Sequence, residues 1–138
     1  MTYTIEDLHP GMSESFTKTV SERDVTLFGE ISGDTNPVHF DDGFAKNTIF
    51  KGRIAHGLLS ASYISTVLGM KMPGPGTIFL SLTTRFTAPV RIGDTVTAIC
   101  TVREVDAARR RVLFDCVCKV KDTVVLEGAA LVMAPTTS

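Results

Sequence analysis

The chain has 138 residues, of which 43% are hydrophobic and 21% are charged, and its formal net charge is −1 at pH 7. This length is close to the common size of one domain, so we expect a single domain over residues 1–138 with a sizeable core. The near-neutral charge argues against a nucleic-acid-binding protein, which normally carries a basic stripe. No apolar run approaches the roughly 20 residues that cross a bilayer, so we expect no membrane partner either.

The first half of the chain is predicted to be mainly helical. Ser21 with Asp24 forms a capping-box start for a helix that ends at Gly33, and Asp41 is predicted to cap a second, short helix. Around these helices we expect a short strand at residues 14–20 and a loop at residues 47–55.

Residues 56–70 are predicted to form a buried helix. The segment contains no proline, and apolar side chains surround nearly its whole circumference. A helix that is apolar on all sides is normally buried. The side chains concerned are Leu58, Leu59, Ala61, Ile64, Val67 and Leu68.

The second half of the chain is rich in Thr, Val, Ile and Phe and predicts antiparallel strands joined by hairpins. The basic run Arg109–Arg111 falls at one hairpin tip. Its favoured interpretation is a solvated turn, and contact with a phosphorylated ligand is the alternative. One buried helix followed by a long curved sheet predicts an α+β domain with the sheet wrapped around the helix. The predicted strands are 77–88, 94–106, 110–121 and 123–134.

The three cysteines favour a reducing compartment, and therefore the cytoplasm. Their number is odd, and Cys116 and Cys118 lie two apart in a β-rich run, which places both on one face of a strand. We expect buried thiols that act as small hydrophobic groups. Zinc binding is disfavoured because no Cys-x-x-Cys pair or nearby histidine completes a site. Residues 1–11 also lack the basic-then-apolar order of a signal peptide.

Asp34 and His39 are the candidate catalytic pair. They lie five residues apart in Gly-Asp-Thr-Asn-Pro-Val-His-Phe, on a turn directly after a predicted helix. A carboxylate and an imidazole that converge on one water can share general acid and base roles near neutral pH. Two alternatives remain open: simple turn formers beside a surface histidine, and, less favoured, a metal site made with His56.

Gly57 is the candidate anion-binding residue, because it falls at the start of the predicted buried helix. The first N–H groups of a helix lack partners, and the helix dipole is positive there. They can therefore stabilise an oxygen that gains negative charge, and glycine lets that oxygen approach closely. The alternative is an ordinary helix start in which His56 has a structural role.

These motifs resemble the hydratase 2 motif of MaoC-like, R-specific enoyl-CoA hydratases, and the similarity runs from about residue 10 to residue 133. The resemblance implies a hot-dog fold, in which the sheet wraps around helix 56–70. It also implies that Asp34 and His39 activate a water, that the Gly57 N–H receives a thioester oxygen, and that no metal or redox cofactor takes part. The segments that carry it are Asp34-x-Asn36-Pro37-Val38-His39, His56-Gly57-Leu58, Phe86–Val90 and Gly93–Val96.

The implied reaction interconverts trans-2-enoyl and (R)-3-hydroxyacyl thioesters of coenzyme A or acyl carrier protein. The resemblance places substrate contacts at Asn36, Ser62, Ser65 and Leu68, although internal packing is an alternative for Ser62. Competing functions are a hot-dog acyl-CoA thioesterase, an acyl-carrier-protein dehydratase of fatty-acid synthesis and, less favoured, a non-catalytic acyl-binding subunit. Open sheet edges, together with the resemblance, predict a homodimer or a multiple of it, with each site shared between subunits.

Overall fold

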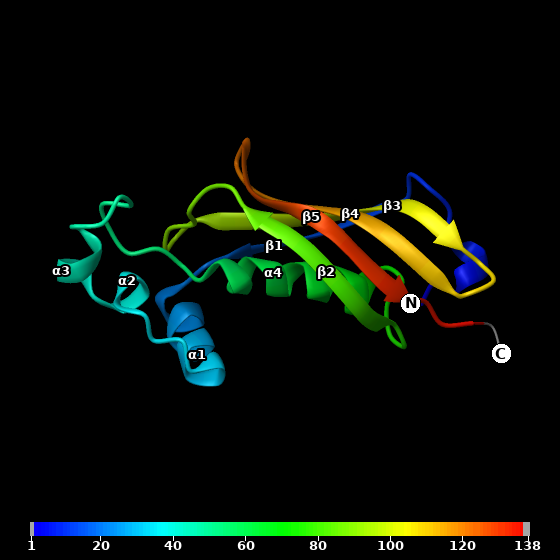
Figure 1. Ribbon diagram of the computed structural model, residues 1–138, viewed down its shortest axis with the longest axis horizontal. Coiled ribbons are helices and arrows are strands. Elements are labelled where there is room, and N and C mark those ends of the chain that lie inside the picture. Colours follow the sequence, from blue (N-terminus) through cyan, green and yellow to red (C-terminus); the bar gives the residue numbers. More distant parts are fainter. Residues whose placement is uncertain (1, 137–138) are drawn as a thin grey trace.

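A curved antiparallel sheet with one helix lying along it dominates the fold (Figure 1). The computed structural model describes residues 2–136, so the predicted domain limits Met1 and Ser138 lie outside the described residues. Among these residues the elements are η1 (Ile5–Asp7), β1 (Ser13–Thr19), α1 (Glu22–Ser32), α2 (Pro37–Phe40), α3 (Asp42–Ala45), α4 (Gly57–Thr66), the π-helical turn η2 (Val67–Lys71), β2 (Ile78–Phe86), β3 (Thr95–Asp106), β4 (Arg111–Val120) and β5 (Thr123–Met133).

The strands are ordered β1-β3-β4-β5-β2, and every neighbouring pair is antiparallel. Alternate residues of β3 and β4 are buried, as expected for strands with one face toward a core. This arrangement confirms the predicted α+β class with an antiparallel sheet wrapped around a central helix. The buried side chains of the two strands are Val96, Ala98, Cys100, Val102, Val112, Phe114, Cys116 and Cys118.

Helix α4 packs one side into this core, where its Ile64 and the adjoining Val67 of η2 are fully buried. The expectation that the helix is covered on all sides is wrong for the described chain. Leu58 is 60% exposed, and Ser62 and Ser65 are exposed along the same stripe. Hydropathy alone could not reveal this stripe, because Leu58 is as apolar as the residues that are buried.

Helices α1, α2 and α3 extend beyond one end of the sheet, next to the start of α4 (Figure 1). The predicted caps are confirmed: Asp24 N donates to Ser21 Oγ (3.1 Å), Phe44 N donates to Asp41 Oδ1 (3.0 Å), and Gly33 ends α1 with a φ of 78°. The one-turn helix α2, however, lies where only a turn was predicted. No helix among residues 2–136 has the length and apolar character needed to cross a membrane.

The core geometry predicts inert thiols, because all three cysteines are free and buried. Burial raises the pKa of the Cys118 thiol to about 12, and contact with Cys116 together with burial raises the pKa of Cys100. Because the thiolate is the reactive form, the native protein should react with Ellman's reagent at least about tenfold more slowly than protein unfolded in guanidinium chloride. Rapid labelling of the native protein would contradict this packing.

Candidate active site

A cavity of about 390 Å³ lies where the overhanging helices meet the start of α4. Asp34, His39, His56 and Gly57 all line it, so the fold brings both predicted groups of catalytic residues to one place. The rest of the lining is mostly apolar and comes from the loop before α4, the first residues of that helix, the end of β2 with the segment that follows it, and one residue of β5. These residues are Phe50, Ile54, Ala55, Leu58, Ser60, Phe86, Thr87, Ala88, Pro89, Val90 and Val125.

The His39 imidazole is held in one orientation and one tautomer. It is 8% exposed, and its Nδ1 lies 2.8 Å from the carbonyl oxygen of Ile54. A carbonyl can only accept, so Nδ1 carries the proton, and Nε2 is left as an acceptor for a ligand. Burial lowers the pKa of His39, and this effect outweighs the opposing effects of the Ile54 bond and the Asp34 carboxylate. His39 is therefore a neutral base near pH 7.

Asp34 places a carboxylate beside this imidazole. Its Oδ1 accepts a bond from Asn36 N (3.2 Å), which orients the side chain within the loop. One possible ligand atom of each of Asp34, His39 and His56 lies within 4.8 Å of the other two. Two groups that each bond the same water at about 2.8 Å, at a tetrahedral angle, lie about 4.6 Å apart. The spacing between Asp34 and His39 therefore suits a single shared water.

The start of α4 supplies N–H donors on the same cavity. No described residue accepts from the N–H of Gly57 or Leu58. Phe86 lies directly over Gly57, and a Cβ at position 57 would stand 2.7 Å from its ring. A larger residue here would therefore displace the Phe86 ring, whereas glycine leaves the backbone open to close approach by a ligand. This N-terminus can stabilise a developing oxyanion.

The Asp34–His39–His56 cluster is poorly arranged for a metal ion. The two imidazole rings are stacked, with centroids 3.9 Å apart and 26° between their planes. A metal ion binds in the plane of an imidazole ring, about 2.0–2.1 Å from the ring nitrogen. Because these two rings are stacked, their nitrogen lone pairs lie in two different planes and do not converge on one point. The geometry favours proton transfer over metal binding.

Comparison with known proteins agrees with this site. The family model described as "MaoC like domain" matches residues 8–124. The chain belongs to the MaoC-like family.

Two curated relatives cover most of the chain. An (R)-specific enoyl-CoA hydratase of Rhodospirillum rubrum is 51% identical over 130 residues, which are 94% of this chain and 90% of the relative. A 3-hydroxybutyryl-CoA dehydratase of Methylorubrum extorquens is 50% identical over 130 residues, which are 94% and 83% of the two chains. Among solved structures, the unliganded R-hydratase PhaJ1 of Pseudomonas aeruginosa has a TM-score of 0.92 and 40% identity, and the match covers 98% of this chain and 87% of that one. The fold is therefore the hot-dog fold of the R-hydratases.

The four predicted substrate-binding residues of this MaoC-like chain are not among the residues that line the cavity. Asn36 Oδ1 accepts from Val38 N (3.2 Å) and caps α2, and the Ser62 hydroxyl donates to Leu59 O (2.5 Å), as its packing alternative expected. Leu68 is 1% exposed within the core, and Ser65 lies on the uncovered stripe of α4. Their contact with substrate stays a prediction.

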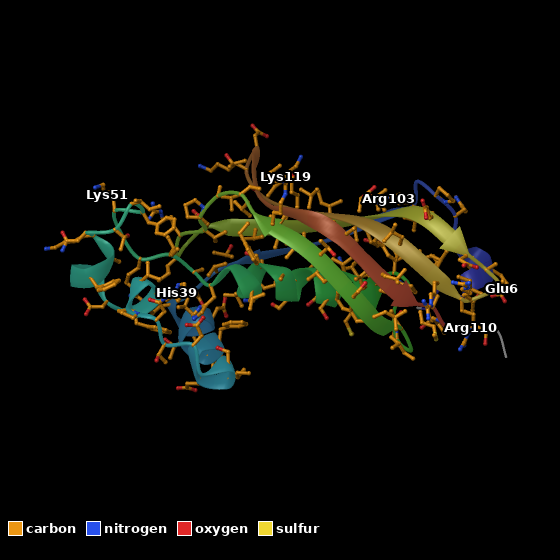
Figure 2. All side chains as sticks on the ribbon, viewed as in Figure 1. Glu6, His39, Lys51, Arg103, Arg110 and Lys119 are labelled. Atoms are coloured by element: carbon orange, nitrogen blue, oxygen red, sulfur yellow. The ribbon has the colours of Figure 1, made fainter. Side chains whose placement is uncertain are left out.

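The basic run at the hairpin tip lies far from the site. Figure 2 labels Arg110 at one end of the molecule and His39 at the other. Arg110 is exposed and adopts a φ of 58° in the turn between β3 and β4. This placement fits the solvated turn rather than contact with a ligand in the cavity.

Sequence reasoning missed two residues that shape the site. Arg53 Nε donates to His39 O (2.6 Å), and its guanidinium pairs with Glu22 (2.9 Å), which ties α2 to α1. Phe86 covers Gly57 from the end of β2. The partners of Arg53 lie 14 and 31 residues away, and Phe86 lies 29 residues from Gly57, so no local pattern signals either contact.

The buried His39 ring predicts a low titration midpoint. Because burial disfavours the charged imidazolium, the midpoint should lie below the ordinary value of 6.5, and His39 should be neutral above it. Proton–carbon NMR of the imidazole groups measures this, and a His39→Gln variant assigns the signal. A midpoint above 6.5 would mean that the Asp34 charge outweighs burial.

Proposed function

We propose that this chain interconverts trans-2-enoyl-CoA and (R)-3-hydroxyacyl-CoA by adding or removing water. The observation that carries the proposal is that the Asp34–His39 pair and the free N–H groups at the start of α4 line one cavity. A hydratase needs both parts: an acid–base pair for the water and the C2 proton, and donors for the thioester oxygen.

In the hydration direction, the shared water attacks C3 of the enoyl group. The C2–C3 π electrons move toward the thioester, and its oxygen gains negative charge as an enolate. Donors at the Gly57 end of α4 stabilise this oxygen, an effect worth about 3–4 kcal/mol in comparable oxyanion holes. The pair removes one proton from the water and returns one to C2, so Asp34 and His39 end the cycle as they began it. We propose no resident metal or redox group for this reaction.

The apolar lining provides a surface for the acyl chain. Phe50, Ile54 and Leu58 lie on the α4 side of the cavity. Phe86, at the end of β2, and Val125, in β5, line it from the sheet. Burying apolar surface contributes roughly 25 cal/mol per Å². The acyl chain can therefore be held by this wall while its thioester is held by the helix start.

The test is absorbance of the enoyl-thioester band on mixing the protein with crotonyl-CoA. Hydration bleaches this band without releasing a thiol, and chiral analysis should give the R product. Release of free CoA would instead identify a thioesterase, and mainly S product would contradict the proposal. Turnover of crotonyl-acyl carrier protein but not of crotonyl-CoA would favour the acyl-carrier-protein dehydratase. Binding without turnover would favour an acyl-binding subunit.

If Asp34 and His39 form the acid–base pair, conservative substitution of either residue should greatly lower turnover. Asp34→Asn and His39→Gln should each fold normally and lower turnover about a hundredfold or more, as expected for general acid–base groups. Circular dichroism checks folding. Matched controls are Asp42→Asn and His9→Gln, which make the same chemical changes at exposed positions that do not line the cavity. Near-normal turnover in either dyad variant would remove that residue from the mechanism.

We further propose a homodimer, or a multiple of it, in which the partner completes each site. Apolar side chains that a single chain leaves exposed support this proposal, because contiguous exposed apolar surface marks interfaces. Strand β2 is an open edge of the sheet, and open edges favour pairing. The exposed side chains of α4, η2 and β2 are Leu58, Met70, Ile78, Phe79, Leu80 and Phe86.

Sedimentation equilibrium at micromolar concentration tests the assembly. The active species should have at least twice the mass of the 14.9 kDa chain. Phe79→Asp, on the β2 edge, should shift the protein toward monomer and lower its activity, because a charge buried in an apolar interface is unfavourable. Ile49→Asp, at an exposed loop position outside this surface, is the matched control. An active single chain would contradict both the dimer and the shared site.

A further inference from the structure

We propose that His56 is a positioning residue that sets the spacing between the Asp34–His39 pair and the oxyanion-binding start of α4. The inference rests on the proposed hydration activity. His56 lies between the segment that carries Asp34 and His39 and the start of α4.

One hydrogen bond of His56 joins the two halves of the site directly. Its Nε2 lies 2.9 Å from the backbone carbonyl oxygen of Asp34, 22 residues away in sequence. The carbonyl accepts, so Nε2 carries the proton. His56 also occupies the cap position of α4, next to Gly57. The His56 side chain thus links the backbone of Asp34 to the start of α4.

The His56 ring is itself held firmly. It is 2% exposed and stacks on His39 with ring centroids 3.9 Å apart. The rings of Phe28 and Phe40 pack against it, with centroids 4.8 and 5.7 Å from its own. These partners come from α1 and α2, so the ring also fixes the overhanging helices against α4. The Nδ1 atom is buried and no described residue bonds it. Among the described residues, the Asp34 carbonyl is therefore the one hydrogen-bond partner of this ring.

Such a link matters for the rate of the chemical step. A water held by Asp34 and His39 must meet C3 while the thioester oxygen meets the Gly57 N–H, so the two halves must keep a fixed distance. A displacement of about 1 Å can cost about a hundredfold in rate. Losing the link should therefore lower kcat, while the apolar wall that binds the acyl chain, and with it KM, changes little.

The test compares His56→Gln with His56→Asn, two amides that differ by one methylene. The amide nitrogen of glutamine occupies roughly the place of Nε2 and can still donate to Asp34 O, whereas that of asparagine occupies the place of Nδ1 and cannot reach it. Both variants lose the ring, so the stacking contribution cancels. We expect kcat of His56→Asn to be at least about tenfold below that of His56→Gln, with KM values within about threefold.

Tyr63→Phe is the control for removing one buried polar atom from α4, because the Tyr63 hydroxyl is buried and unbonded by any described residue. If His56→Asn does not fold, His56→Leu, which also lacks both the ring and the donor, replaces it in the comparison. Equal kcat in the paired variants, or a loss confined to KM, would overturn this inference alone. Absence of hydration by the wild-type protein would instead overturn the proposed function.

Discussion

Burial of α4 against the concave face of the sheet is the constraint on which the rest of the site depends. Ile64 is fully buried there, and removing such a side chain costs about 2–5 kcal/mol in other proteins. The helix axis is therefore fixed by the core, and its first residues emerge at the end of the sheet. Just before the helix, Ala55 N donates to Val90 O (2.7 Å), which anchors the chain to the segment after β2. The proposed oxyanion donors thus have a position set by packing rather than by a loop.

The proposed acid–base pair is positioned in another way, because it lies outside the sheet, with Asp34 in the loop after α1 and His39 on α2. Its position depends on specific contacts: Arg53 on the His39 carbonyl, the Ile54 carbonyl on Nδ1, and the Phe40 ring packed against Gly29, where a Cβ would stand 2.6 Å from it. These contacts also bury the imidazole, which lowers the pKa of His39 and keeps it a base near neutral pH. The same contacts therefore hold His39 in place and keep its imidazole neutral.

The sequence was sufficient to predict features that depend on local pattern. The Ser21–Asp24 capping box, the β3–β4 and β4–β5 hairpins and the helix that begins at Gly57 follow from caps, turns and periodicity. The predicted hairpin between the first two strands of the second half was wrong, because β2 pairs with β5 and not with β3. The close approach of Asp34, His39 and Gly57 followed from the family resemblance rather than from spacing. The stacking of His39 on His56, 17 residues apart, required the folded chain. So did the exposed stripe of α4, because hydropathy does not show which side of a helix lacks a partner.

The central claim is that one thioester is held by the start of α4 while its C3 faces the Asp34–His39 pair. A crystal structure of the slow His39→Gln variant with bound crotonyl-CoA tests this most directly. We expect a thioester oxygen about 2.7–3.1 Å from the Gly57 nitrogen and C3 turned toward the Asp34 carboxylate. A thioester oxygen bonded elsewhere, with the Gly57 N–H facing only solvent, would contradict it.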